Sequence, residues 1–421
     1  FGSALAFADR ARRCGAGGEL LGSASLIAAQ AHRWRGEHAH ACEQGAIAMA
    51  RLPSDDPAFF SALAEVAVAR GRLGQMDRLA DAYRAFRDAP RPRAGTPAAS
   101  QRSIAATFLA LHLLTCGQPD LALAIVDELE ADATVAMEIE VRARVAQVRA
   151  FRALFRGDLG AYLLGMETAV EAFESAGDTR EACVQRVSVG NACVQLGAYP
   201  RAEIALARAL SEASRMGLEN VVGYAKQNLA IARARSGRLD EAWRLIQEAI
   251  DLFQSQGDRR MVGTSRVYAS LIRADMGAAY DAVLAAEQAT IDLEVATSAQ
   301  ACAFAALALV RAALARSLPG DGRPALIEGA AGAAKDARRI LDELDGIEEG
   351  EGLVHLAEVE ALILAGDDGA PDAARAAVDR LERKAERIAD PSLRASFLDN
   401  VPEHRRLRAI ARGDAAREPA G

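Results

Sequence analysis

Residues 187–210 read VSVGNACVQLGAYPRAEIALARAL, with Gly197 between two runs of apolar residues at helical spacing. Glycine adopts the left-handed backbone conformation that ends a helix without strain. Pro200 lies just inside the second run, where its missing N–H costs nothing because first-turn amides have no helical partner. The stretch therefore predicts two antiparallel helices joined by a tight turn at Gly197.

The same pattern returns every forty residues, as in YAKQNLAIARARSGRLDEAWRLIQEAI at residues 224–250. Turn glycines of one ladder are Gly117, Gly157, Gly197, Gly237 and Gly277, and those of a second ladder half a period away are Gly177, Gly217 and Gly257. Small residues stand seven positions before each first-ladder glycine (Ala110, Ala150, Gly190, Ala230, Ser270). This is a repeat array, and its hairpins must stack to bury the apolar face that each one leaves exposed.

The array extends beyond these five units. Gly36 and Gly74 indicate two earlier hairpins, and residues 318–324 and 366–372 indicate turns of two later ones, giving about nine hairpins and no strand. We expect degenerate hairpins over residues 1–100, the regular array over 101–300, degenerate hairpins and a closing helix over 301–412, and a disordered tail at 413–421.

A turn glycine with small residues seven before and five after, an aliphatic residue nine after and alanine twelve after resembles the tetratricopeptide repeat (TPR). The resemblance is specific from about Leu109 to Leu293, and it departs in its period of forty residues against about thirty-four. It implies an all-α, right-handed superhelical solenoid whose concave face binds peptides or partner helices.

The segment SLRASFLDNVPEHRRLRAIAR, residues 392–412, is similar to the closing segment of TPR regions in large bacterial serine/threonine kinases and their ATPase relatives, especially myxobacterial ones. That likeness implies the regulatory C-terminal part of a larger signalling protein, with its own kinase or ATPase domains as one partner. A first residue of Phe1 agrees with this expectation.

Composition excludes several classes of partner. The formal charge is −8 and the pI about 5.5, with no sustained basic stripe, so we expect no nucleic-acid partner. No apolar run suggests a membrane span. Six cysteines are scattered without metal or redox spacing, as expected for reduced thiols in the cytoplasm. The acidic stretch LDELDGIEEGEG, residues 341–352, is interpreted as a solvated helix end and loop.

Motifs for catalysis are absent from the sequence. There is no GxxxxGK[ST] loop, no kinase motif set and no GxSxG elbow, so we expect neither an enzyme nor a cofactor. His32, His38, His40 and Cys42 form a local cluster, but His38, His40 and Cys42 cannot easily share an ion, because residues two apart on a helix point in nearly opposite directions. Of these, His38 and Cys42 are four apart and could. We interpret the cluster as packing and surface histidines, without a metal.

The first helix of each hairpin is expected to line the concave face. Amides and a tyrosine there can hydrogen-bond a peptide backbone, and arginines favour a carboxylate or phosphate. The expected groove residues are Arg144, Gln147, Phe151, Asn191, Gln195, Tyr224, Gln227, Asn228 and Arg235.

Two of these residues invite comparison with a known peptide site. Asn191 and Asn228 correspond to two asparagines of the TPR carboxylate clamp, but Val187 replaces its first lysine, and Thr264 and Tyr268 stand where cations are expected. The alternative is that the asparagines cap or bridge neighbouring helices.

Three functions remain open. The first is a non-catalytic protein- or peptide-binding scaffold, and the alternative is a small-ligand or signal-peptide sensor whose superhelix closes on its ligand. An enzyme using Arg144, Asn191 and Arg235 for hydrolysis would need converging carboxylates with shifted pKa values. Residues 283–314, almost bare of charge, are the expected docking surface for further domains.

Overall fold

The computed structural model describes the chain except residues 133–137, 294–296, 319, 321, 345 and 415–421, and the described part contains helices and no strand. The helices are α1 (Gly2–Arg13), α2 (Gly18–Arg35), α3 (His38–Arg51), α4 (Pro57–Arg72), α5 (Met76–Asp88), α6 (Pro97–Thr115), α7 (Pro119–Ala131), α8 (Ile139–Phe155), α9 (Leu159–Ser175), α10 (Thr179–Gln195), α11 (Tyr199–Met216), α12 (Glu219–Arg235), α13 (Leu239–Gln256), α14 (Arg259–Asp275), α15 (Ala279–Asp292), α16 (Thr297–Ser317), α17 (Arg323–Glu343), α18 (Glu351–Ala365), α19 (Ala370–Glu386), α20 (Pro391–Asp399) and α21 (Pro402–Ala411).

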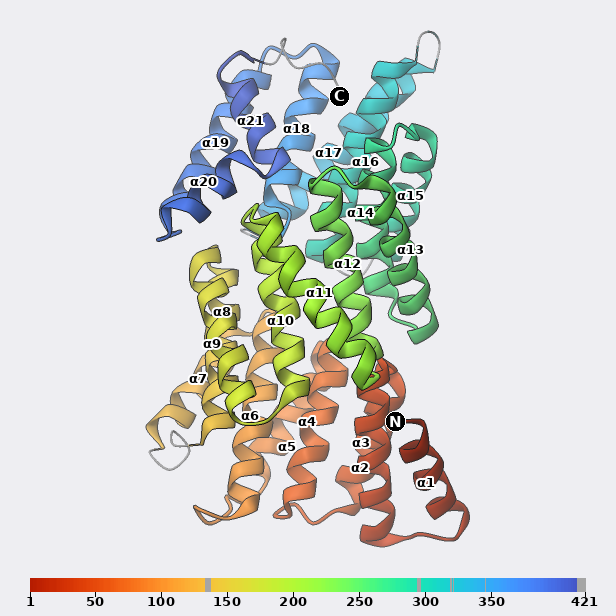
Figure 1. Ribbon diagram of the computed structural model, residues 1–421, viewed down its shortest axis with the longest axis vertical. Helices are drawn as coiled ribbons and strands as arrows, with labels where there is room; N and C mark the ends of the chain where they lie inside the picture. Colours follow the sequence, from red (N-terminus) through yellow and green to blue (C-terminus); the bar gives the residue numbers. More distant parts are fainter. Residues whose placement is uncertain (133–137, 294–296, 319, 321, 345, 415–421) are drawn as a thin grey trace.

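From α2 to α19 the helices pair into nine consecutive hairpins, which confirms the expected all-α repeat array (Figure 1). The turns form as expected. Gly197 has φ +69°, its N–H donates to the Val194 carbonyl at 3.0 Å, and the Ala198 N–H donates to the Cys193 carbonyl at 2.9 Å. These bonds satisfy carbonyls that the end of α10 would otherwise leave unpaired.

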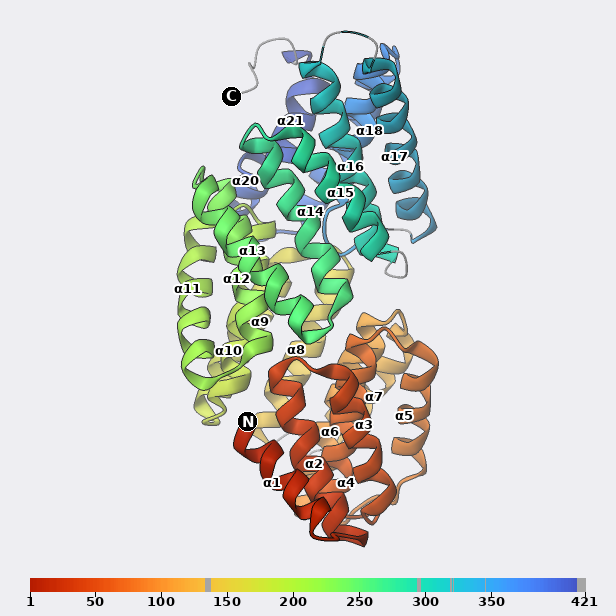
Figure 2. The ribbon, with the colours of Figure 1, turned by 90° about the vertical axis from the view of Figure 1, so that its right-hand side faces the viewer.

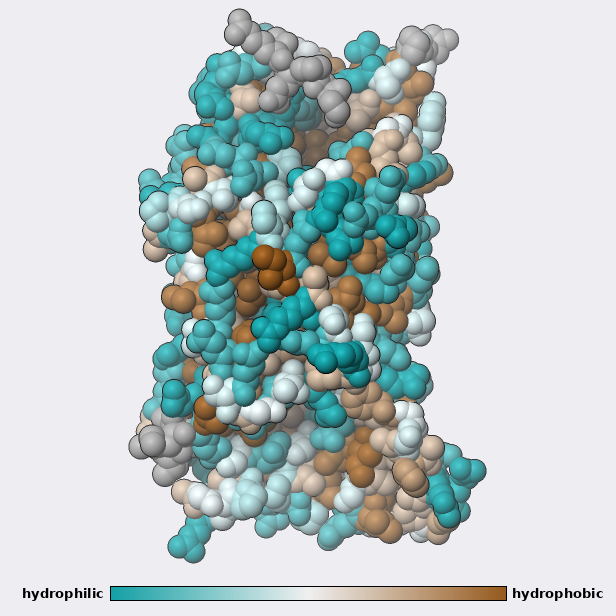
Figure 3. Space-filling view, viewed as in Figure 1, coloured by the Kyte–Doolittle hydropathy of each residue, from teal (hydrophilic) through white to brown (hydrophobic). Residues whose placement is uncertain are grey.

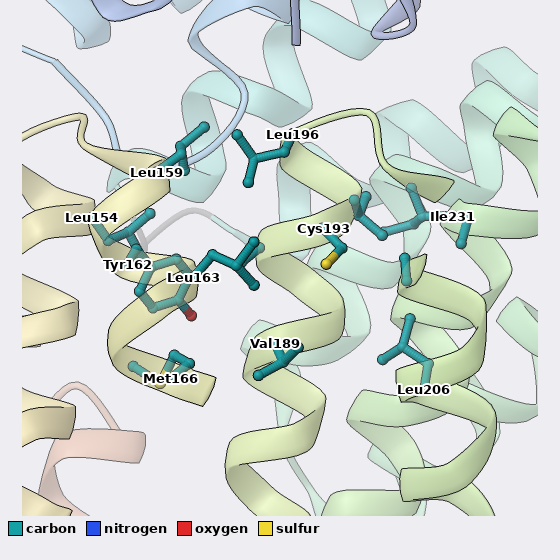
Figure 4. Close-up of a cluster of buried hydrophobic side chains, with 14 of the residues drawn as sticks. Leu154, Leu159, Tyr162, Leu163, Met166, Val189, Cys193, Leu196, Leu206 and Ile231 are labelled. Carbon is teal, nitrogen blue, oxygen red and sulfur yellow. The ribbon is translucent and has the colours of Figure 1, made fainter. Parts of the chain in front are cut away.

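The small-residue columns sit where two helices of a hairpin approach most closely. A Cβ added at Gly190 would lie 2.3 Å from Cγ of Leu206 on the facing helix. Figure 4 shows Leu206 of α11 in the central hydrophobic cluster with Tyr162 and Met166 of α9 and Cys193 of α10. The cluster is continuous across successive hairpins, so each unit is stabilised by its neighbours.

The even-numbered helices from α2 to α18 form the inner layer. Most successive members pack on one another, and α8 and α10 are linked by the Arg144–Glu181 ion pair. The array winds along the long axis, with α1–α7 at one end and α16–α21 at the other (Figures 1 and 2). Winding brings α2 against α12 near the N-terminal end. At the other end α20 and α21 return to the turns of earlier hairpins: the Asn400 amide donates to the Gly197 carbonyl at 3.1 Å.

The divisions expected at residues 100 and 300 lie near the first residues of α6 and α16. Most of the expected tail, residues 413–421, lies outside the described residues. Ser298–Ser317 has the length and mean hydropathy of a membrane span, contrary to expectation, with 56% of it buried in the array. It packs against α14, α15, α17 and α18, as a core helix does.

Residues 283–314 are mainly core. Most of the described apolar side chains there are buried, including Leu293, Leu307, Val310 and Leu314, because α16 lies inside the array. Leu284 and Ile291 are the large exposed residues in this range, at 65% and 56%. On the face shown in Figure 3, hydrophobic residues occur as separate spots among hydrophilic ones. The expected docking surface is thus reduced to two side chains.

Candidate binding groove

Polar side chains gather on the inner layer of helices. Most of the buried polar and charged residues belong to even-numbered helices, including Glu65, Arg144, Glu181, Gln227 and Asn228. Burying such groups is costly unless they are paired, so their placement on one layer requires partners across the groove. They fall into three groups along the groove: a charged cavity, a row of amides and a second cavity.

The charged cavity, here called the N-terminal cavity, has a volume of about 380 Å³. Residues from α2, α4, α6, α8 and α10 line it, among them Trp34, Phe108 and Arg180. The Arg144 guanidinium lies over the Phe108 ring at 4.2 Å, and that of Arg33 over the Trp34 ring at 4.0 Å. Aromatic faces attract cations, so both guanidinium groups are held in place by rings as well as by carboxylates.

Two buried carboxylates complete this cavity. Arg33 Nε lies 2.9 Å from Glu65 Oε2, and Arg33 Nη1 lies 3.4 Å from Glu181 Oε1. Arg144 Nη2 lies 3.5 Å from the same Glu181 oxygen. Burial raises the pKa of Glu65, and Arg33 offsets this only in part. Burial also opposes ionisation of Glu181, but Arg144 and Arg33 together lower its pKa. Two cations therefore hold Glu181 ionised.

Glu65 and Glu181 have the feature that an enzyme would require. Their carboxylates lie in one cavity, and the pKa of Glu65 is raised while that of Glu181 is lowered. Each one is engaged by a guanidinium, however, so the group is an ion-paired network with no free base. Arg144 and Arg235, expected in one hydrolytic groove, line different cavities. Burial also raises the pKa of Cys183 and Cys193 to about 11, which disfavours the nucleophilic thiolate.

The row of amides bridges neighbouring inner helices. Asn191 on α10 donates to Oδ1 of Asn228 on α12 at 3.0 Å, and the Gln195 amide donates to Oδ1 of Asn191 at 2.8 Å. Ser265 on α14 donates to Gln227 at 2.7 Å. The Asn191–Asn228 and Ser265–Gln227 bonds bridge neighbouring helices, and Asn228 also donates to the Tyr224 carbonyl at 2.9 Å.

The remaining expected groove residues have other neighbours. Arg72 of α4 donates to the Tyr224 hydroxyl at 3.0 Å, which ties an N-terminal hairpin to α12. Phe151 packs against Tyr162 with ring centroids 5.6 Å apart. Gln147 is buried one turn beyond Arg144. The structure therefore places Arg144 in one cavity and Gln195 and Arg235 in another, while the other expected residues are engaged in contacts with neighbouring side chains.

The second cavity, here called the C-terminal cavity, has a volume of about 130 Å³. Gln195 and Arg235 line it from the regular array, and Glu403 and His404 line it from α21. Arg235 pairs with Glu403 across 168 residues of sequence. Burial disfavours ionised Glu403, but Arg235 outweighs it and lowers the pKa of Glu403. This pair joins the closing segment to the groove.

The acidic stretch is where the sequence interpretation fails. Residues 346–350 are here called the groove loop, and 347–350 of this loop form one wall of the C-terminal cavity instead of projecting into solvent. Ile347 is 8% exposed, and the Glu349 carboxylate accepts a hydrogen bond from the Tyr268 hydroxyl of α14. The sequence signal that could have found it is the isolated Ile347 between acidic residues, since an aliphatic residue in a solvated loop has no packing role.

A three-residue cluster could offer metal ligands. Nδ1 of His32 lies 2.5 Å from Oε2 of Glu37, and the rings of His32 and His40 stack with centroids 5.2 Å apart. His38 and Cys42 take no part in this cluster. Arg35 already donates to Glu37 at 2.9 Å, so its carboxylate is engaged by a cation and by His32.

Comparison with known proteins supports the fold. No protein-family model matches the chain, and no curated protein matches it in sequence. A solved Rap protein complexed with Competence and Sporulation Factor is similar over 86% of this chain and 100% of its own, with 12% identity and a TM-score of 0.58. The apo form of RapI is similar over 85% and 97%, with 10% identity and a TM-score of 0.48. The Rap protein with the bound factor is a TPR-type helical repeat, so the resemblance to a TPR region is confirmed at the level of the fold.

Proposed function

We propose that this chain is a non-catalytic scaffold that binds an extended peptide or protein segment in the groove of α8–α14. One observation carries the proposal: hydrogen-bonding side chains of successive first helices converge on that groove, including Asn191, Gln195 and Tyr268. An extended peptide presents N–H and C=O groups at regular intervals, and amides and hydroxyls can satisfy both. The Rap protein of similar fold, solved with a bound factor, supports the same use of this architecture.

We further propose that the chain serves as the regulatory or sensing part of a bacterial signalling protein in the cytoplasm. The closing segment, residues 392–412, supports this assignment through its likeness to kinase-linked arrays. In the structure that segment docks on the groove through Glu403 and Asn400. Occupation of the groove is therefore positioned to alter the C-terminal hairpins, which would transmit binding to a joined domain.

A peptide library tests the binding proposal. Random dodecapeptides displayed on phage are selected on the purified chain, and a selected peptide is measured by fluorescence anisotropy. We expect at least tenfold weaker binding by Gln195→Ala, which removes a donor at the cavity wall, and unchanged binding by Gln254→Ala on exposed surface of α13. Selected peptides that bind both variants as well as wild type would place their site outside the groove and reject the proposal.

The N-terminal cavity favours a second candidate, a sensor for a small ligand. Its volume lies within the range of small-molecule sites, about 300–1,000 Å³, and its lining combines rings with both signs of charge. A thermal-shift screen with amino acids and common metabolites tests it. A genuine ligand stabilises wild type and not Gln101→Trp, which fills the cavity, while Gln254→Trp keeps the response. A panel with no stabilising compound counts against this candidate.

A further inference from the structure

The groove loop, residues 346–350, is held in the C-terminal cavity by contacts from several inner helices. Tyr268 of α14 donates to the Glu349 carboxylate, and Asn191 of α10 lies near enough to lower the pKa of the same carboxyl. Cys302 of α16 lies with Sγ 3.4 Å from the Glu349 carbonyl oxygen. Groove residues thus contact both the side chain and the backbone of Glu349, as they would contact a bound peptide.

Neighbouring residues of the groove loop also contact the surrounding helices. Ile347 is buried with Leu353 and Val354 in one hydrophobic cluster. Ser298 donates to the Glu348 carboxylate at 3.1 Å. The loop backbone also lies close to α16, since a Cβ added at Gly350 would fall 2.4 Å from Cys302 Sγ. An aliphatic residue, a backbone carbonyl and a carboxylate two positions after the aliphatic residue are therefore each contacted by the groove.

Glu349 is half-buried, and the contacts around it lack the cationic partner that a carboxylate in such a position normally has. Among the described residues, no lysine, arginine or histidine forms an ion pair with Glu349. Two cations that line the same cavity are paired with other carboxylates: Arg235 pairs with Glu403, and Lys384 pairs with Glu351. Neutral donors compensate only part of the cost of removing a carboxylate from water. The Glu349 carboxylate is therefore held in the groove without an ion-pair partner, and a cavity of about 130 Å³ lies beside the loop.

The groove loop also has a glycine at each end, which allows the backbone to move so that the loop can leave the cavity. Gly346 and Gly350 bracket it with φ of +120° and +85°, conformations that glycine adopts without strain. Both belong to the connection between α17 and α18, so the loop can withdraw without unwinding either helix.

We propose that the groove loop is an internal occupant of the peptide site, and that the external ligand is an acidic peptide carrying an aliphatic residue two positions before a carboxylate. This inference rests on the proposed peptide-binding function and specifies its ligand. The ligand's carboxylate takes the place of Glu349 at Tyr268 and Asn191, and its aliphatic side chain takes the place of Ile347. Ligand and loop exclude each other, so binding requires the loop to leave.

The test uses the full chain and a fluorescein-labelled peptide GIEEGEG, the sequence of residues 346–352. The double variant I347G/E349S removes the side chains that seat the loop. We expect this variant to bind the peptide at least tenfold more tightly than wild type, and the added substitution Tyr268→Phe to weaken that binding at least tenfold. A peptide in which glutamine replaces the glutamate equivalent to Glu349 should bind more weakly. Equal affinity of wild type and double variant overturns the inference.

A second measurement keeps the inference testable on the wild-type chain alone. Hydrogen exchange of the amides at 346–350 should be slow without peptide and should speed up when GIEEGEG is present in excess. Exchange that is already as fast as in an unstructured peptide contradicts a seated loop, whether or not the double variant folds. If library-selected peptides bind the groove of both forms equally while GIEEGEG binds neither, the proposed function stands and the internal occupant is rejected.

Discussion

Arg33 of α2 and Glu181 of α10 form an ion pair inside the N-terminal cavity, although 148 residues separate them in the chain. Arg144 approaches the same carboxylate from α8. The pair therefore joins the first hairpin to the fifth and holds the N-terminal end of the superhelix closed. Arg235 and Glu403 do the same at the other end of the groove.

Glu181→Ala should lower the free energy of unfolding by about 3–5 kcal/mol, because it leaves two buried guanidinium groups without their shared carboxylate. Urea denaturation followed by circular dichroism measures the loss. The matched control is Glu248→Ala, which breaks an exposed pair with Lys226 and should cost about 0–1 kcal/mol. Similar losses for both variants would show that the buried network does not hold the fold closed.

Acidification should destabilise the protein through His112. Burial lowers the pKa of His112 to about 3, with Arg72 adding to the effect, so the folded state keeps this imidazole neutral. In the unfolded chain this histidine binds a proton near pH 6.5. The stability that neutral His112 contributes is therefore fully present above that pH and is lost as the pH falls toward 3. The loss at pH 5 relative to pH 7.5 is about 2 kcal/mol from this residue.

Urea denaturation across pH 4.5–7.5 checks this prediction with His112→Gln as the comparison. The variant should lose about 2 kcal/mol less than wild type on acidification, whatever its stability at neutral pH. Parallel pH profiles for the two proteins would assign the acid sensitivity to other groups, of which buried His38 is the next candidate, since burial and Arg72 lower its pKa to about 4.

Glycine substitutions should separate packing from helix propensity. Gly190→Ala places a methyl group against Leu206 and should destabilise by about 1–3 kcal/mol through overpacking. Gly332→Ala, in the exposed interior of α17 with no atom near its added Cβ, should stabilise by about 0.5–1 kcal/mol. Melting temperatures of the two variants relative to wild type should move in opposite directions. A shift of the same sign in both would contradict the packing of α10 on α11.

Seating of the groove loop should weaken as pH rises. Burial raises the pKa of Glu349, so the seated loop favours the protonated carboxyl. The free-energy cost of holding a charged Glu349 in the groove is absent below the ordinary pKa of a glutamate. It grows as the pH rises from that ordinary pKa to the raised pKa of Glu349. The groups facing Glu349 are Tyr268, Cys302 and Glu348, with Arg235 farther away. Burial and Glu349 raise the pKa values of Tyr268 and Cys302, so both stay neutral.

Hydrogen-exchange protection factors at residues 346–350, measured from pH 5 to pH 7.5, report this change directly. They should fall in wild type and stay level in Glu349→Gln, whose neutral amide oxygen still accepts from Tyr268. A pH-independent wild-type profile would mean that Glu349 does not titrate in this range.

Local features of the chain determined the hairpins and the layer that lines the groove. Gly197 ends α10 because a left-handed turn needs no information from outside the repeat, and Gly190 fits against Leu206 because both lie within one hairpin. The array, its period and the small-residue columns were all predictable for this reason. The interpretation of the asparagines as bridges was also available, since Asn191 and Asn228 lie in successive repeats.

Tertiary structure alone decided how the array closes. Small rotations between successive hairpins accumulate into the superhelix, so the partners of Arg33, Arg235 and Glu349 depend on the winding of the whole array. The spacing of residues in the sequence does not determine the total rotation that accumulates along the array. For the same reason the sequence identified residues 341–352 as acidic but not as groove-filling. The charge of Glu349 is a local property, whereas its partial burial depends on α10, α14 and α16 meeting around it.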